Sequence, residues 1–318
     1  VAAAAGAVLA RSGARRGAAS AAEALGGPLH IAQLLVGADK VFYASPRGHA
    51  VVLWELQPVL PGHLLVLPRR PAARLAELTN EEVSDLFGTA VQAQELIKSA
   101  HGATAFNWAL KDGEAARPAI QQVHLHIVPR KVGDLETNDI VYDRIDRWYP
   151  LAGFANTPPA LNWPEDDTRR ARTEEDMALE ASGYARLRPP EPGVLPTEDV
   201  QFGQFRLKPS QVFHASPTGL TLAFVNLKPL QPGHVLVIPR RVVPTIAGLT
   251  QEERDDLFFT VRVVQRLVEK AHGATSTTLG MQDGREAGQS VPHVHVHILP
   301  LGGGRAAPGQ AGARASSL

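Results

Sequence analysis

Cysteine is absent from this 318-residue chain, which excludes disulfides, thiolate zinc sites and a cysteine nucleophile. Charge of one sign is not in excess either, because Lys plus Arg and Asp plus Glu number 32 each. No global field therefore draws the protein to nucleic acid or to an anionic membrane. Apolar runs of about 18 residues, the length of a membrane span, are also missing, so we expect a soluble protein. Any affinity for phosphate must come from a local site.

The two ends of the chain have compositions unlike the rest. Residues 1–27 are rich in Ala and Gly and carry three arginines before the first acid, Glu23. This composition fits either a disordered tail or the remnant of an organelle transit peptide. We accordingly expect a cytoplasmic protein or, in the second case, a mitochondrial or plastid one. Residues 305–318 are expected to form a second disordered tail.

One segment of the chain occurs twice. Residues 41–129 recur 171 positions later without a gap, and about 40 of the 89 positions are identical. The clearest pairs are Pro-Gly-His at 61–63 and 232–234, His-Gly-Ala-Thr at 101–104 and 272–275, and His-x-His at 124–126 and 295–297. Such a register indicates two copies of one folded unit, because insertions gather where structure is absent. We predict two like domains packed as a pseudo-dimer within the chain, with further self-association left open.

Both copies predict the same secondary structure. Alternating segments at 49–56 and 220–227 indicate strands. In each copy a capping box, Thr followed three residues later by Glu, begins a helix, and a His-Gly pair ends it. These helices are expected from 79 to about 100 and from 250 to about 271. The predicted fold class is α+β: two domains, each an antiparallel sheet with one long helix and one or more short ones.

Domain boundaries follow from the repeat and from composition. The first domain is predicted over 28–188, including a C-terminal tail with a short helix from about 173 to 184. A stiff, Pro-rich linker is expected over 189–199. The second domain is predicted over 200–304.

Three histidines alternate with valines in residues 293–297. Side chains on a strand switch faces at every residue, so the imidazoles are expected on one face, with His295 bare on the sheet surface. The pattern fits solvated histidines, a His-x-His zinc site, or nucleophilic attack on phosphorus by a neutral imidazole. No acid stands nearby in the sequence to complete a zinc site. Neutral donors that suit phosphate oxygens do stand nearby, at Gln282, Gln289 and Ser290.

Several motifs of the second copy occur together in one known family. They are Phe202-Gly-Gln, Lys208-Pro-Ser, Phe224-Val-Asn226, Pro232-Gly-His234, Met281-Gln-Asp-Gly284 and His293-Val-His-Val-His297. With them, residues 200–300 resemble the fragile histidine triad branch of the histidine triad (HIT) superfamily. The resemblance implies hydrolysis of diadenosine triphosphate or tetraphosphate by double displacement, through a covalent nucleotidyl-histidine.

The resemblance also implies a role for each site residue. His295 attacks the α-phosphorus, His293 and His297 flank the phosphate, and His234 orients the nucleophile. The expected substrate contacts are Gln282, Gln289 and Ser290 at the phosphate or leaving group, and Asn226 on the ribose side. No metal or cofactor is expected to be bound by the protein itself, although the polyphosphate is expected to arrive with Mg²⁺ or Mn²⁺.

The first copy keeps only part of this site. The counterparts of the nucleophile, the last histidine and the orienting histidine are all retained, as His124, His126 and His63. The other positions differ, with Gln122 for His293, Lys111 for Gln282, Glu55 for Asn226, and Arg117-Pro118-Ala119 for residues 288–290. Proline removes a backbone donor and alanine a hydroxyl. We predict a degenerate first site, with an altered substrate or full activity as the alternatives.

A division of labour follows, in which the first copy supports and the second catalyses. The stretch from Arg130 to Asp134, with Asn138, Tyr142 and residues 163–186, resembles the tail that follows the histidine strand in the same family. Three other functions remain open. They are a nucleoside phosphoramidate hydrolase, a nucleotide-binding signalling protein with slow turnover, and a zinc protein.

Overall fold

The structure is a computed structural model of the whole chain. It describes residues 29–303, apart from 32–33, 38–39, 117, 119, 147–163, 165–167 and 190–192. The tails predicted at 1–27 and 305–318 lie outside the described residues, as do Arg117, Ala119 and part of the linker predicted over 189–199.

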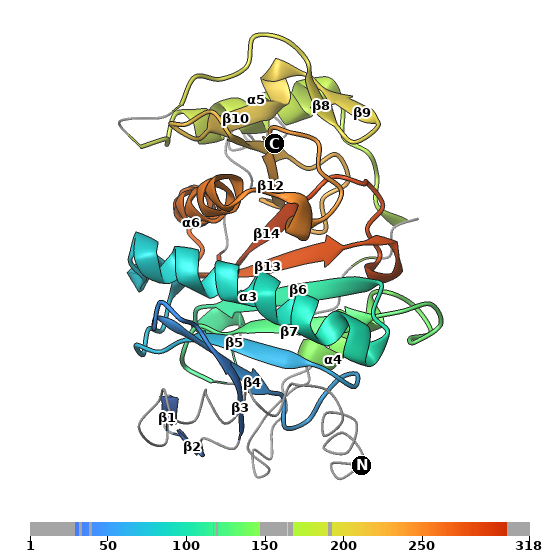
Figure 1. Cartoon of the computed structure of the whole chain (residues 1–318). Coiled ribbons are helices and arrows are strands. Elements are labelled where there is room, and N and C mark those ends of the chain that lie inside the picture. The colour runs from blue at the N-terminus through green and yellow to red at the C-terminus, as the bar shows by residue number, and fades with distance from the viewer. Residues whose placement is uncertain are drawn as a thin grey trace. The chain divides into compact units, whose positions relative to one another are not determined.

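The strands and long helices of the two repeats correspond (Figure 1). The first repeat contains β1 (Leu29–Ile31), β2 (Leu34–Val36), β3 (Val41–Ala44), β4 (Ala50–Trp54), β5 (Leu64–Pro68), the 3-10 turn η2 (Leu75–Glu77), α3 (Asn80–His101), β6 (Ala105–Asp112), η3 (Glu114–Ala116) and β7 (Leu125–Arg130). The second contains β8 (Val200–Phe202), β9 (Phe205–Leu207), η5 (Pro209–Gln211), β10 (Val212–Ala215), β11 (Thr221–Val225), β12 (Val235–Pro239), η6 (Ile246–Gly248), α6 (Gln251–His272), β13 (Ser276–Asp283), η7 (Arg285–Ala287) and β14 (Val296–Leu301). Helices α4 (Ile140–Asp146) and α5 (Glu174–Ala185) lie between them in the sequence. Each strand and long helix of the first repeat returns 171 positions later, which confirms the duplication.

In each repeat five of the seven strands pair side by side and antiparallel, and the other two form a separate hairpin. The order of the five is β3-β4-β5-β7-β6 in the first repeat and β10-β11-β12-β14-β13 in the second. The central strands β5 and β12 are aliphatic at nearly every position and buried throughout, as strands covered on both faces must be. This arrangement confirms the predicted α+β class.

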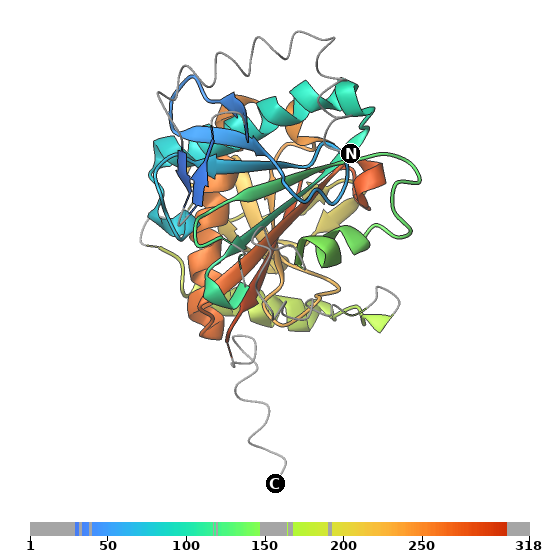
Figure 2. The same cartoon turned by 90° about the horizontal axis from the view of Figure 1, so that it is seen from below.

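One long helix covers the sheet of each repeat, as predicted. The Thr79 hydroxyl accepts from the Glu82 amide at 3.2 Å while the Glu82 carboxylate accepts from the Thr79 amide at 2.8 Å, and Gly102 closes α3 in the left-handed region. Helix α6 has the same two caps. Helix α3 packs on β4, β5 and β7, and α6 packs on β11, β12 and β14 (Figures 1 and 2). No helix in the described part of the chain has the length and apolar character needed to cross a membrane.

Two short hairpins extend the repeat further toward the N-terminus than the sequence indicated. Strand β8 pairs with β9, and β1 pairs with β2 at the corresponding positions of the first repeat. Phe202 of β8 belongs to the same hydrophobic cluster as Val291, and its counterpart Ile31 of β1 belongs to the same cluster as Ile120. Each hairpin therefore belongs to the core that lies next to its own histidine segment.

The chain folds into two compact units whose limits differ from the predicted domains. Of the residues that the structure describes, one unit contains those within 1–110, 118–160 and 282–289, and the other contains those within 111–117, 161–281 and 290–318. Helix α5, predicted as the tail of the first domain, falls in the second unit because it packs on β10, β11 and α6. Its Tyr184 is fully buried there, 4.8 Å from Phe213 between ring centroids. The predicted pseudo-dimer packing stays a prediction.

Candidate active site

The ring of His295 is held by a hydrogen bond that determines which nitrogen carries the proton. Its Nδ1 lies 2.7 Å from the carbonyl oxygen of His293. A carbonyl oxygen only accepts, so Nδ1 must be protonated and Nε2 of the neutral ring must hold a lone pair. His295 thus has the tautomer that a nucleophile requires.

His293 uses both of its ring nitrogens on the protein backbone. The amide of Gly203 donates to Nδ1 at 3.2 Å, and Nε2 donates to the carbonyl of Pro239 at 2.9 Å. The ring is completely buried. Both ring nitrogens of His293 are thus engaged by backbone groups, and its expected place beside the phosphate stays a prediction.

His234 forms a ring-to-ring hydrogen bond with His297, and its expected role in orienting His295 stays a prediction. The amide of Leu230 donates to His234 Nδ1 at 3.1 Å, which puts the His234 proton on Nε2. That nitrogen donates to Nδ1 of His297 at 2.8 Å, so the proton of His297 must be on its own Nε2. His295 and His297 are neighbours, with ring centroids 5.0 Å apart. The site therefore places a donor, His297 Nε2–H, on the ring next to that of His295.

The histidines are covered, which corrects the expectation that His295 lies bare on the sheet surface. His295 is 4% exposed, and the Phe202 ring of β8 meets it edge-on at 5.5 Å between centroids. Strand β14 begins at Val296, so only His297 of the three lies within it. Burial lowers the pKa of His295 and of His293, and it lowers the pKa of His297 well below the usual range. Burial thus favours the neutral form of all three rings.

Two arginines that the sequence analysis missed stand beside this site. Arg172 donates through Nε to the carbonyl of Asn226 at 3.0 Å, and Arg169 donates to the carbonyl of Lys228 at 2.9 Å. The Asn226 amide nitrogen in turn lies 3.2 Å from His234 Nε2. Burial first, then Arg169 and Arg172, lowers the pKa of His234 to about 3. These arginines precede α5 in a segment without a repeat, so internal comparison of the copies gave no signal for them.

The predicted substrate contacts Gln282, Gln289 and Ser290 are divided between the compact units. Gln282 and Gln289 bound the segment that belongs to the first unit, and Ser290 begins the next segment, in the second unit. Gln289 accepts from the Gly284 amide at 3.3 Å through its side-chain oxygen. Ser290 is exposed. Their contact with a substrate stays a prediction.

The first repeat reproduces the histidine geometry although its sequence predicted a degenerate site. His124 Nδ1 donates to the carbonyl of Gln122 at 2.7 Å, and His63 Nε2 lies 3.0 Å from His126 Nδ1. Gln122 makes the same kind of hydrogen bond as its counterpart His293. Its Nε2 donates to the carbonyl of Pro68 at 3.0 Å, as His293 Nε2 donates to that of Pro239. Lys111 is buried and falls in the second unit. The first repeat therefore keeps the arrangement of its histidine rings.

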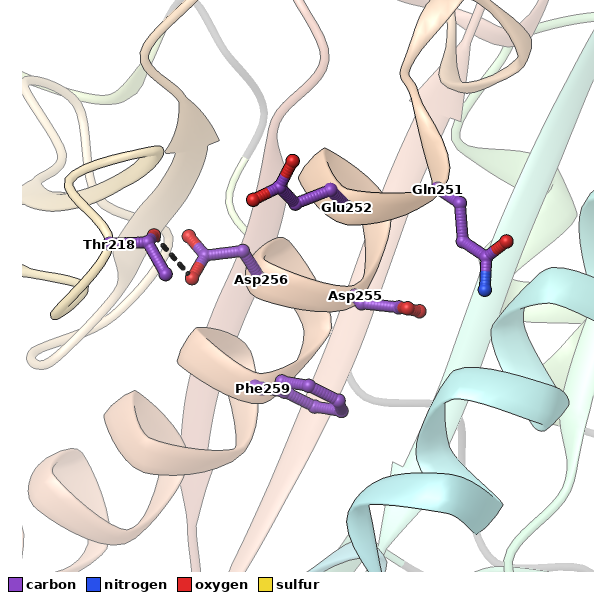
Figure 3. Close-up of a pocket in the computed structure, with 6 residues that line it drawn as sticks. All are labelled: Thr218, Gln251, Glu252, Asp255, Asp256 and Phe259. Atoms are coloured by element: carbon purple, nitrogen blue, oxygen red, sulfur yellow. Dashed lines mark hydrogen bonds between the residues drawn. The ribbon is translucent and has the colours of Figure 1, made fainter.

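A hollow at the start of α6 lies apart from the histidines (Figure 3). Figure 3 shows the Thr218 hydroxyl donating to Asp256, at 2.7 Å. The residues that line this hollow are Thr218, Gln251, Glu252, Asp255, Asp256 and Phe259. Three carboxylates repel phosphate, so this hollow does not suit a nucleotide.

Comparison with known proteins identifies the class of protein. The HIT domain family matches residues 37–133 and 208–303, which is more than half of the chain. The chain belongs to the HIT domain family and carries two HIT domains in tandem.

Individual relatives match part of the chain. The bifunctional bis(5'-adenosyl)-triphosphatase/adenylylsulfatase FHIT of Arabidopsis thaliana is 52% identical over 103 residues, which cover 32% of this chain and 56% of that protein. The bis(5'-nucleosyl)-tetraphosphatase (asymmetrical) of Schizosaccharomyces pombe is 58% identical over 91 residues, covering 29% and 49%. The crystal structure of the Caenorhabditis elegans NitFhit protein is 44% identical, covers 36% of this chain and 28% of that one, and has a TM-score of 0.33. The matches thus span about half the length of the first two relatives.

Proposed function

We propose that the second repeat hydrolyses dinucleoside polyphosphates, such as diadenosine triphosphate and tetraphosphate, through a nucleotidyl group on His295. The observation that carries this proposal is the bond from His295 Nδ1 to the carbonyl of His293, at 2.7 Å. It leaves a lone pair on Nε2 of a ring that burial keeps neutral, which is the form of imidazole that attacks phosphorus. Relatives named as triphosphatases and tetraphosphatases support the same substrate class.

In the first step the lone pair of His295 Nε2 attacks the α-phosphorus. The bond from that phosphorus to the bridging oxygen breaks, and its electron pair stays on the leaving nucleoside phosphate. His297, with its proton on Nε2, offers a hydrogen bond to the phosphate oxygens. Nearby Arg169 and Arg172 attract the negative charge of the chain of phosphates.

In the second step water resolves the intermediate. The water oxygen bonds to phosphorus, the bond between Nε2 and phosphorus breaks, and its electron pair returns to His295. One proton of the water is released, and the product is a nucleoside monophosphate. The chain's own residues carry these steps without a bound metal ion, and Mg²⁺ or Mn²⁺ enters with the polyphosphate.

A trapping experiment tests the proposal on the full chain. Protein quenched during turnover of labelled diadenosine triphosphate should carry one labelled nucleotidyl group, which peptide mapping should locate on His295. His295→Ala should carry no label, and its kcat should fall at least about 10⁴-fold, because the covalent route is closed.

His124→Ala is the matched control, since the same ring in the first repeat has the same hydrogen bond. It should keep nearly full activity. Normal hydrolysis by His295→Ala, or a label on another residue, would contradict the proposal. Parallel assays with an adenosine phosphoramidate and a measurement of Kd separate this function from phosphoramidate hydrolysis and from slow-turnover signalling.

A further inference from the structure

The histidine site of the first repeat contains a carboxylate that the second repeat lacks. Glu55 occupies the position of Asn226 and is only 6% exposed. Single donor atoms of Glu55, His63 and His126 all lie within 4.8 Å of one another. Among the residues that the structure describes, this is the one group of three such side chains close enough to share an ion.

We propose that Glu55, His63 and His126 form a binding site for one divalent transition-metal ion of the zinc type. Two imidazoles and a carboxylate bind ions of the zinc type, whereas Mg²⁺ prefers ligands that are all oxygen. Three protein ligands leave one coordination position for water. In the second repeat the equivalent trio has a neutral carboxamide in place of the acid. Among the positions that differ between the two sites, this exchange is the one that adds a carboxylate beside the histidine rings.

The spacing of the two rings already approaches that of coordinated imidazoles. Zinc–nitrogen bonds of about 2.0–2.1 Å at a tetrahedral angle hold two nitrogens about 3.3 Å apart. His63 Nε2 and His126 Nδ1 are 3.0 Å apart. The ion replaces the shared proton but lies to one side of the line between the two nitrogens, so the rings separate by a few tenths of an ångström and tilt until both lone pairs point at the ion.

That proton has a defined destination. In the metal-free protein His63 holds it on Nε2, because Nδ1 accepts from the amide of Val59 at 3.2 Å. When Nε2 bonds to the metal, the proton moves to Nδ1 of the same ring. The Val59 amide then loses its acceptor and turns away. Metal binding should for this reason be visible at the Val59 backbone amide, four residues before His63.

Calorimetric titration of untagged full-length protein with ZnCl₂ tests the site directly. The wild type should bind one Zn²⁺ with a Kd at or below the micromolar range, and MgCl₂ should give no comparable heat. Glu55→Asn, which restores the residue of the second repeat, should weaken zinc binding by at least about 100-fold, beyond the loss caused by removing a supporting contact. Glu114→Gln removes an exposed acid of the same repeat and should leave binding unchanged.

An NMR titration supplies the local readout. Zinc should shift the Val59 amide signal in the wild type and in Glu114→Gln, and should leave it in place in Glu55→Asn. Absence of stoichiometric zinc binding in the wild type, or equal binding in Glu55→Asn, would overturn the proposal. Neither readout involves turnover, so this proposal and the one for His295 fail independently.

Discussion

At the scale of single residues, burial keeps His63 and His234, one histidine in each repeat, neutral. The pKa of His63 is lowered to about 3 by burial and then by His124, and that of His234 is lowered to about 3 by burial and then by the two arginines. In an unfolded chain such rings titrate near 6.5. Their protonation is therefore linked to unfolding.

We predict that acid destabilises the protein through these rings. Between pH 6.5 and about 3 the unfolded chain binds a proton on each ring that the folded chain does not, so the free energy of unfolding falls as the pH falls. Each histidine should contribute up to about 1.4 kcal/mol per pH unit, a slope reached once the pH is well below 6.5. Urea unfolding of the wild type and of His234→Gln at pH 7, 6 and 5 measures this. If the free energy of unfolding of His234→Gln fell with pH as steeply as that of the wild type, the lowered pKa of His234 would be contradicted.

At the scale of elements, the segment before α5 connects a helix to the site. Arg172 pairs with Glu180 of α5 and also donates to the Asn226 carbonyl. The Tyr184 hydroxyl donates to Glu180 at 3.0 Å, which orients that carboxylate. Helix α5 thus holds Arg172 against the loop that precedes His234, and Arg169 lies in the same segment.

We predict that Arg169 strengthens substrate binding by its charge. Arg169→Gln should raise KM for diadenosine triphosphate about tenfold and change kcat little, because the attraction acts on bound substrate and transition state alike. Added salt should raise KM more in the wild type than in this variant, since salt screens the charge. The matched control is Arg170→Gln, which removes an exposed neighbouring cation and should behave as the wild type. Equal effects of the two variants would refute a specific role.

At the scale of the whole molecule, each compact unit contains a short segment of the other repeat. Gln94 donates to Asp283 at 2.7 Å within one unit, and Gln265 donates to Asp112 at 2.9 Å within the other. All four side chains are buried. Because the two bonds are related by the repeat, they give a matched pair of probes.

We predict that each of these acids stabilises the helix of the opposite repeat. Asp112→Asn belongs to the first repeat by sequence but should lower amide-exchange protection in α6, by about 1–3 kcal/mol for a weakened buried charged hydrogen bond. Asp283→Asn should lower protection in α3. Hydrogen-exchange mass spectrometry of both variants measures this. If Asp112→Asn affected only α3, the exchange of segments would be contradicted.

The sequence by itself determined what depends on neighbours along the chain and on its own repetition. The capping boxes at Thr79 and Thr250 and the glycine caps predicted both long helices, because a cap needs only residues within one turn. The repeat predicted two like domains, and the motif predicted the family. The tautomer of His295 was within reach too, since its partner is the carbonyl two residues earlier.

The tertiary structure alone decided which distant groups meet at the histidines. Phe202 covers His295 from a hairpin that the sequence analysis did not recognise as part of the repeat. Glu55 meets His63 and His126 although no acid stands beside the His-x-His motif in the sequence, and Arg169 reaches the site from a segment with no copy. Such contacts arise because antiparallel pairing and helix packing bring together residues far apart in the chain, and no local pattern records them.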